Sequence, residues 1–171
     1  RQASLFAAGW TIGSLKFLSE AGVHAVTYYE TIGWRGIMDS KNPPQRPAKS
    51  PSSPGKVFPV YHVLRDFSDF SGGRVQRFHS SDNLSVVGLA LRKNNRVRLL
   101  IANLKDQPKT VAIHGVSASS VTVRALDAES MESANKDPEG FNKRTGKIQS
   151  ADQLIDLAPH AIVRVDFSEE R

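Results

Sequence analysis

The residues of this sequence that could do chemistry lie close together, directly after an apolar run. The run, Ala25 to Tyr29, leads into the carboxylate of Glu30 and then into Thr-Ile-Gly-Trp-Arg-Gly. A positioned carboxylate can bind a hydroxyl group or act as a general acid or base. The ring of Trp34 can stack on the apolar face of a ring-shaped ligand, and the guanidinium of Arg35 can bind a carboxylate through two parallel hydrogen bonds. Glu30 is therefore the candidate catalytic residue. The candidate substrate-binding residues are Tyr29, Trp34 and Arg35.

Each of these side chains also has a structural explanation, which the sequence leaves open. Glu30 could pair with Arg35 or cap a neighbouring helix, and Trp34 could be an apolar plug that holds the loop in place. In a strand, Tyr28 and Tyr29 point to opposite faces, so at most one of them could reach a substrate. Tyr29 is nearer the end of the run, but packing in the core is the favoured role of both.

Other kinds of reactive site lack their sequence patterns. There is no cysteine, and the five histidines are scattered without an H-x-H or HExxH pattern. We therefore expect neither a thiolate site nor a metal site. No Gly-rich phosphate-binding motif and no G-x-S-x-G motif occurs, so we expect no cofactor and no serine nucleophile of that kind.

The net charge of +6 is spread along the chain rather than concentrated. When the chain is divided after Gly72, the first part has 8 Lys and Arg against 5 Asp and Glu, and the second has 15 against 12, so each carries +3. Nucleic-acid-binding proteins usually gather their cations on one face or helix, so a nucleic-acid partner is disfavoured. No apolar run reaches about 18 residues, so we expect no membrane partner. The start of the sequence has no signal-peptide pattern, which favours a cytoplasmic location.

The hydrophobic pattern of the first third of the chain predicts a helix followed by a strand. Apolar residues recur at helical spacing over residues 4–21, and Gly22 suits a C-terminal cap. Gly9 and Gly13 lie on one face of this helix, which indicates close packing against a neighbour. Residues 25–30 are then expected to form a parallel strand that is covered on both faces, because the run is too apolar to alternate.

The remaining pattern predicts one more helix and then only strands. A proline-rich loop over 40–56 should be extended and mobile, and the apolar face of 57–70 predicts a helix with Pro59 in its first turn. After Gly73, short runs rich in Val, Ile and Leu are separated by polar turns, which predicts an antiparallel sandwich or barrel. The runs are 86–93, 96–104, 110–116, 120–126 and 160–167. The polar segment 131–150 is expected to be a long hairpin or loop.

The order of these elements is unusual for a complete domain. A single apolar strand between two helices cannot satisfy its backbone groups without neighbouring strands. We therefore predict a mostly β chain, with an antiparallel β-sandwich at residues 73–171. It is preceded, at residues 1–72, by an α-β-α segment that looks like the last unit of a (β/α)8 barrel. Barrel active sites lie at the carboxyl ends of the strands, which is where Glu30 would stand.

Three stretches of the sequence carry a resemblance to a known family. They are "GWTIGSLKFLSEAGVHAVTYYETIGWRGIMD", "FPVYHVLRDFSDFSGG" and "VRLLIANLKDQPKTVAIHG". They resemble the C-terminal part of bacterial TIM-barrel proteins of the glycoside-hydrolase-like kind, most closely the D-apionate lactonase family. The resemblance implies a parent enzyme that acts on a sugar-derived acid, lactone or glycoside. It also implies that the β-sandwich is an accessory domain.

On this interpretation the chain lacks the earlier barrel strands, and its main partner would be the missing N-terminal barrel of the same protein. Glycoside hydrolysis needs two carboxylates at a set separation, so we expect the chain, with Glu30 alone, to be inactive toward a sugar-derived small molecule. If residues 1–72 are the last unit of a barrel whose other strands are missing, apolar surface should be exposed within them.

The alternative is a self-contained β-sandwich that binds a protein or a carbohydrate. In that case residues 26–29 would pair with a strand of the sandwich. Carbohydrate-binding sandwiches usually expose aromatic side chains, but no Trp or Tyr follows Gly73, which weakens the carbohydrate-binding version.

Overall fold

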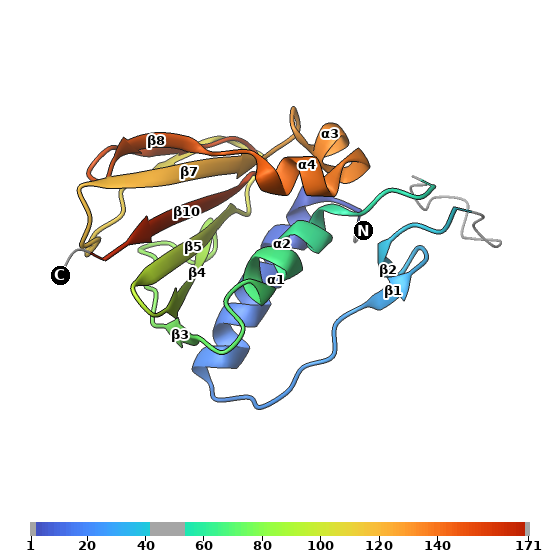
Figure 1. The fold of residues 1–171 in the computed structure, drawn as a ribbon, viewed down its shortest axis with the longest axis horizontal. Coiled ribbons are helices and arrows are strands. Elements are labelled where there is room, and N and C mark those ends of the chain that lie inside the picture. Colours follow the sequence, from blue (N-terminus) through green and yellow to red (C-terminus); the bar gives the residue numbers. More distant parts are fainter. Residues whose placement is uncertain (1–2, 42–53, 170–171) are drawn as a thin grey trace.

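The computed structural model describes residues 3–41 and 54–169, and it shows a β-sheet with helices on one face (Figure 1). The helices are α1 (Leu5–Glu20), α2 (Pro59–Ser68), α3 (Met131–Lys136) and α4 (Pro138–Lys143). The strands of the main sheet are β3 (Arg74–Gln76), β4 (Val86–Lys93), β5 (Arg96–Asn103), β7 (Ser120–Leu126), β8 (Lys147–Ser150) and β10 (Ile162–Ser168). The remaining strands are β1 (Glu30–Ile32), β2 (Gly36–Met38), β6 (Lys109–Val111) and β9 (Ile155–Leu157).

The main sheet has six strands in the order β3-β4-β5-β10-β7-β8, and every neighbouring pair is antiparallel. A second, two-stranded sheet, β6-β9, contributes Ile155 and Leu157 to the apolar cluster on one face of the main sheet. Leu100 and Ala102 of β5 face the other side, where α1 and α2 lie. Leu99 and Ile101 alternate with them and face β6-β9. The antiparallel β-sandwich predicted from the alternating runs is therefore confirmed.

Helix α1 lies across the main sheet, as the two glycines indicated (Figure 1). A Cβ atom at Gly9 would be 3.1 Å from the Cβ of Ala102, and one at Gly13 would be 3.4 Å from a methyl group of Val87. The helix begins after Ser4, whose hydroxyl accepts a hydrogen bond from the Ala7 N–H at 3.2 Å. Without a side chain at Gly9, the helix backbone can approach β5 closely.

The strand expected over 25–30 is wrong except for its last residue. Residues 23–29 belong to no strand, and only Glu30 enters β1, which pairs in parallel with β2. An extended segment needs a neighbouring strand to pair its backbone N–H and C=O groups, and no other described strand lies beside residues 23–29. Val26 is consequently 44% exposed. The pairing of 26–29 with a sandwich strand, which a self-contained sandwich would require, does not form.

The segment 131–150 also differs from the predicted hairpin or loop. It contains α3 and α4 before β8 begins. Asp137 starts α4, because its carboxylate accepts a hydrogen bond from the Gly140 N–H at 2.9 Å and Pro138 occupies the first turn. Phe141 is 3% exposed and fills the core. Helices of six residues are too short to show a helical period, so the Asp-Pro pair was the available signal.

Helix α2 confirms the helix predicted over 57–70, with shorter bounds and with Pro59 in its first turn. Its entry is tied to β2, because the Phe58 N–H donates to the Ile37 carbonyl at 2.9 Å and the Asp39 N–H donates to the Lys56 carbonyl at 2.9 Å. Most of the proline-rich loop predicted over 40–56 lies outside the described residues.

Candidate functional site

The sequence-predicted site lies on a tight loop between β1 and β2. The two strands are parallel although only Gly33, Trp34 and Arg35 connect them, so the chain must fold back sharply. Gly33 has φ +112°, and the Gly36 N–H donates to the Gly33 carbonyl at 2.8 Å. A Cβ at Gly36 would be 2.9 Å from the carbonyl carbon of Ile32, so no larger residue fits without backbone movement. Both glycines of the loop are therefore required by its geometry.

This loop brings three of the four candidate residues together. The Arg35 guanidinium contacts the Glu30 carboxylate at 2.9 Å, and it lies over the ring of Trp34, 5.3 Å from the ring centroid. The side chains of Glu30 and Arg35 are 52% and 61% exposed, so solvent or a ligand can reach the pair. The ion pair that the sequence left open as a structural explanation is thus present. Both charged groups of the pair are nevertheless at the surface.

The two tyrosines before the loop do not point to opposite faces, and that prediction is wrong. The Tyr28 hydroxyl shares a hydrogen bond of 2.6 Å with Ser14, and the Tyr29 hydroxyl shares one of 2.7 Å with Thr11, so both reach α1. Their rings lie 5.9 Å apart. Strict alternation fails because the segment is not a strand and Tyr29 has φ +50°. Tyr29 is held toward α1 rather than toward Glu30, and its role in substrate binding stays a prediction.

No group of three or more His, Asp or Glu residues within 3–41 and 54–169 is arranged to hold a metal ion. The chemistry available at the loop is therefore that of one exposed carboxylate, one guanidinium and one indole ring. Such a set can bind hydroxyl and carboxylate groups and can accept a proton at Glu30.

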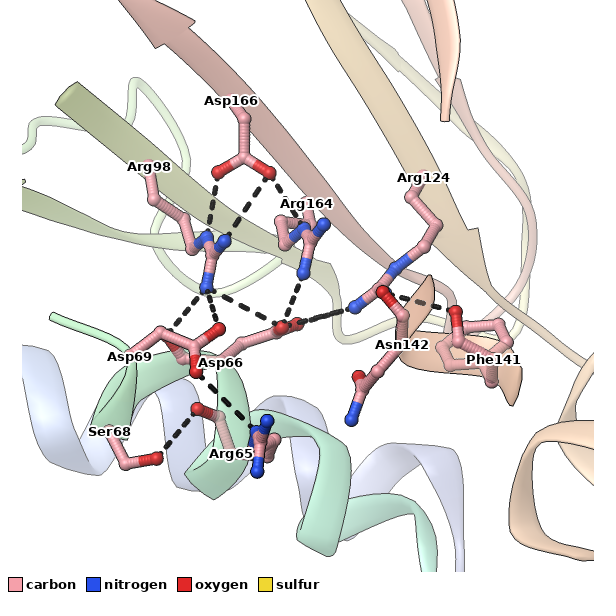
Figure 2. Close-up of polar contacts among 10 residues, drawn as sticks. All are labelled: Arg65, Asp66, Ser68, Asp69, Arg98, Arg124, Phe141, Asn142, Arg164 and Asp166. Atoms are coloured by element: carbon pink, nitrogen blue, oxygen red, sulfur yellow. Dashed lines mark hydrogen bonds and ion pairs between the residues drawn. The ribbon is translucent and has the colours of Figure 1, made fainter. Parts of the chain in front are cut away.

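A second polar cluster, which the sequence analysis missed, is buried between α2 and the main sheet (Figure 2). Asp66 of α2 lies at its centre. Its carboxylate accepts hydrogen bonds from Arg164 at 2.7 Å and from Arg124 at 3.1 and 3.0 Å. Arg98 donates to the backbone carbonyl of Asp66 at 2.9 Å and to the Asp166 carboxylate at 2.7 Å. We call Asp66, Asp69, Arg98, Arg124, Arg164 and Asp166 the buried charge cluster.

The register of the strands explains why these charges are paired. Arg124 and Arg164 stand directly opposite each other on β7 and β10, and like charges in that position repel. The carboxylate of Asp66 lies between them and offsets the repulsion (Figure 2). Burial by itself would lower the pKa of Arg98, but Asp166, Asp66 and Asp69 outweigh it and raise that pKa. The pKa of Arg124 is lowered, chiefly by burial, while Asp66 opposes the change.

A signal for the buried charge cluster was present in the sequence. Arg98 falls in the same alternating set of β5 as Leu100 and Ala102, which face the helices. A cation on the buried side of an apolar strand requires a carboxylate partner. The carboxylate closest to Arg98 is that of Asp166, directly opposite it on β10, at 2.7 Å. Asp66, which compensates Arg124 and Arg164, lies on α2 and could not be identified from the strands.

His62 lies beside this cluster and is 2% exposed. Its ring meets the ring of Phe141 edge-on, with the centroids 5.0 Å apart. Burial lowers the pKa of His62 to about 4, although the nearby Asp66 carboxylate acts in the opposite direction. The ring is therefore neutral at physiological pH.

Comparison with known families decides where the chain belongs. A model of the D-apionate lactonase TIM barrel domain matches residues 1–72, and a model of the C-terminal immunoglobulin-like domain of the same lactonase matches residues 83–165. Together the two matches leave out only a short stretch between them and the last residues of the chain. The chain belongs to the D-apionate lactonase family. It matches none of the curated proteins with which it was compared.

Solved structures similar to this lactonase-family chain include two β-xylosidases and a xylanase. One is a monomeric β-xylosidase from Caulobacter crescentus CB15, with 12% sequence identity and a TM-score of 0.58, over 99% of this chain and 42% of that one. Another is a GH39 β-xylosidase from Caulobacter crescentus, with 15% identity and a TM-score of 0.56, over 99% of this chain and 40% of that one. A third is the family 30 subfamily 8 xylanase Xyn30A from Clostridium acetobutylicum, with 10% identity and a TM-score of 0.54, over 98% of this chain and 40% of that one. These likenesses show the fold, and the chain spans less than half the length of each enzyme.

The family matches give the buried charge cluster a location in the lactonase architecture. Asp66 and Asp69 lie in the part that matches the barrel domain, whereas Arg98, Arg124 and Arg164 lie in the part that matches the immunoglobulin-like domain. The same helix, α2, follows the loop that carries Glu30 and Arg35. The cluster therefore connects the barrel segment that bears the candidate site to the β-sheet.

Proposed function

We propose that the whole protein is a carbohydrate-active hydrolase that opens the lactone of a sugar-derived acid, with the lactone of D-apionate as the first substrate to test. The observation that carries the proposal is the exposed pair of Glu30 and Arg35 beside Trp34. It lies in the part of the chain that matches the lactonase barrel domain. In a barrel enzyme, the loops that follow the strands form the substrate face.

The chemistry of lactone opening suits these groups. Water adds to the carbonyl carbon, the ring C–O bond breaks, and the products are a carboxylate and a hydroxyl group on the same molecule. Arg35 can bind the carboxylate or the carbonyl oxygen, and Trp34 can pack against the ring. Glu30 can bind a substrate hydroxyl or accept a proton from the attacking water. Tyr29, whose hydroxyl is engaged with Thr11, would act only by packing next to the loop.

We propose further that residues 1–72 are covered by the preceding part of the same barrel. Phe6, Trp10 and Phe17 lie on one side of α1 and are 47%, 57% and 51% exposed. Ile32 and Val26 add exposed apolar surface after the helix. Large apolar side chains gathered on one segment usually mark an interface. The chain alone would then lack the earlier barrel strands and be inactive.

Two further aspects of the proposed function concern where the protein acts. The described residues contain no helix that is long and apolar enough to cross a membrane. A cytoplasmic location and a role in bacterial carbohydrate breakdown are predictions that accompany the lactonase proposal.

The experiment compares the full-length protein with two matched variants, Glu30→Gln and Glu129→Gln. Both remove one exposed carboxylate, but Glu129 lies far along the chain, after β7. Acid release from the lactone of D-apionate, and from other sugar lactones, is followed at constant pH. Loss of a positioned general base should lower kcat roughly 100-fold or more in Glu30→Gln and leave Glu129→Gln unchanged. Equal activity of the two variants would remove Glu30 from the site, and no activity of the full-length protein on any lactone would overturn the proposed function.

A further inference from the structure

The end of the main sheet farthest from α3 and α4 carries a polar hollow that the proposed function does not use. It lies where the turn after α2 meets the connection between β4 and β5, with β3 alongside (Figure 1). Its volume is about 590 Å3. Its lining consists of Gly72, Gly73, Arg74, Arg92, Lys93 and Asn94. Three of these six residues are cations, and none is acidic or aromatic.

Two of the three cations of this hollow, Arg74 and Arg92, face each other across β3 and β4, whereas Lys93, the next residue after Arg92, starts from the opposite face of β4. Arg74 on β3 is directly opposite Arg92 on β4, and Lys93 is directly opposite Arg96 on β5. Like charges in such positions repel. The buried charge cluster shows how this fold manages the same problem inside, where Asp66 lies between two opposed arginines. At the surface, Arg92 forms an ion pair with Glu169, and its Nε also donates to the Asn94 carbonyl at 3.2 Å.

The other two cations of the hollow, Arg74 and Lys93, have no carboxylate partner among the described residues. Lys93 donates to the Ser71 carbonyl at 2.7 Å, which orients its ammonium group without supplying a negative charge. Within the described part of the chain, Arg74 has neither an ion pair nor a side-chain hydrogen bond, so its guanidinium donors are available. The backbone beneath them requires glycine at position 73, because a Cβ there would collide with the Arg92 carbonyl oxygen.

From these contacts we infer that this hollow is a binding site for a small oxyanion, a carboxylate or phosphate group. Arginine binds both through parallel N–H donors, and lysine adds a point charge. The absence of aromatic residues from the lining disfavours a neutral sugar, which would need a stacking surface. Arg74 supplies the donors, and Glu169 competes with the ligand for Arg92.

The test is titration calorimetry of the protein with three anions at equal ionic strength: inorganic phosphate, glucuronate and chloride. We expect saturable binding of phosphate, of glucuronate or of both, with chloride giving none. A response to phosphate alone that Arg74→Gln weakens assigns the hollow to phosphate groups, and a response to glucuronate alone that the same change weakens assigns it to carboxylates. Absence of saturable binding, or an equal response to chloride, would overturn the inference.

Three variants locate the site. Loss of one charge-assisted hydrogen bond should weaken binding roughly tenfold in Arg74→Gln, whereas Arg77→Gln, which removes a nearby exposed cation outside the hollow, should bind like the unmodified protein. Glu169→Gln removes the competing acid and should tighten binding. Equal weakening by Arg74→Gln and Arg77→Gln would show a diffuse charge effect and contradict the proposed site. Melting temperatures recorded beside the titrations show that each variant is folded.

Discussion

One nitrogen of Arg124 donates to both carboxylate oxygens of Asp66, at 3.1 and 3.0 Å, across the boundary between α2 and the main sheet. Arg164 reaches the same carboxylate at 2.7 Å. Two cations that oppose each other on neighbouring strands are thus joined through one carboxylate. Because Phe58, at the start of α2, donates a hydrogen bond to Ile37 of β2, the contact also links the candidate site to the β-sheet.

Replacing Asp66 by Asn should destabilise the protein strongly. The amide keeps the shape of the side chain but removes the negative charge from between buried arginines. Breaking one partner of a buried ion pair typically costs about 3–5 kcal/mol, because a charge is left uncompensated. Urea unfolding measures the change, with Asp106→Asn, an exposed carboxylate, as the matched control. A cost below about 1 kcal/mol would show that water reaches the cluster and screens it.

Stability should fall as the pH drops below 6.5, in part through His62. Its pKa is about 4 in the folded protein against an ordinary value of 6.5. The unfolded state therefore binds more protons between these values, so the contribution is complete above pH 6.5 and is lost as the pH falls toward 4. At about 1.4 kcal/mol per pKa unit, the contribution is on the order of 3 kcal/mol.

Urea unfolding of the protein and of His62→Phe at pH 7 and pH 5 isolates this contribution. Phe can occupy the apolar contact with Phe141 but does not titrate, so the variant should lose less stability on acidification. His24→Gln, at an exposed histidine, is the control and should behave like the unmodified protein. An identical pH response in the protein and in His62→Phe would contradict the lowered pKa.

Substitution of Gly36 should disturb the candidate site more than the fold. In Gly36→Ala, the added Cβ would be 2.9 Å from the Ile32 carbonyl carbon, so the β1-β2 loop must rearrange. Displacing Glu30 and Arg35 by about 1 Å can cost roughly 100-fold in rate. Lactonase activity of the full-length protein and its melting temperature are measured together. Gly115→Ala, at φ +78° and with open space around it, is the control for backbone strain alone. Unchanged activity in Gly36→Ala would separate the loop from catalysis.

The two glycines of α1 should respond in opposite directions to larger side chains. Gly13→Ala places its Cβ at 3.4 Å from Val87, an ordinary contact, and replaces a poor helix former, so a gain of about 0.5–1 kcal/mol is expected. Gly9→Val adds a branched side chain where a Cβ is already 3.1 Å from Ala102, so a loss of about 1–3 kcal/mol is expected. Thermal unfolding of both variants measures the difference. A stabilising Gly9→Val would mean that α1 can move away from β5.

Exposed apolar surface on α1 should matter differently in the chain and in the whole protein. Trp10 is 57% exposed here, and the proposed barrel neighbour would cover it. Trp10→Gln should therefore reduce self-association of the 171-residue chain, as measured by sedimentation. In the full-length protein the same change should lower stability by about 1–3 kcal/mol, because it places a polar group in an interface. An equal stability of the full-length protein and its variant would show that nothing packs on Trp10.

The hydrogen-bond and ion-pair partners of the polar side chains could not be predicted from the residues next to them in the sequence. Asp66 and Arg164 are 98 positions apart, and the residues around each of them do not indicate that the two pair. Tyr28 and Tyr29 looked like alternating strand residues, yet both hydroxyls reach α1, because no neighbouring strand holds their segment in a sheet. The Glu30–Arg35 pair was only one of the pairings that the sequence left open.

The amino-acid sequence was enough to predict the elements in which apolar residues recur at a regular spacing. These are the helix that ends before Gly22 and the alternating strands of the sandwich. The sequence also showed the glycines that the turn around Trp34 needs. It also carried the resemblance to the lactonase family, which the family matches confirm. These properties are local, since a period of 2 or 3.6 and a positive φ depend only on neighbouring residues. Only the tertiary structure decided that residues 23–29 form no strand and that three strand arginines meet around Asp66. Pairing and charge compensation depend on residues that the chain brings together from distant positions.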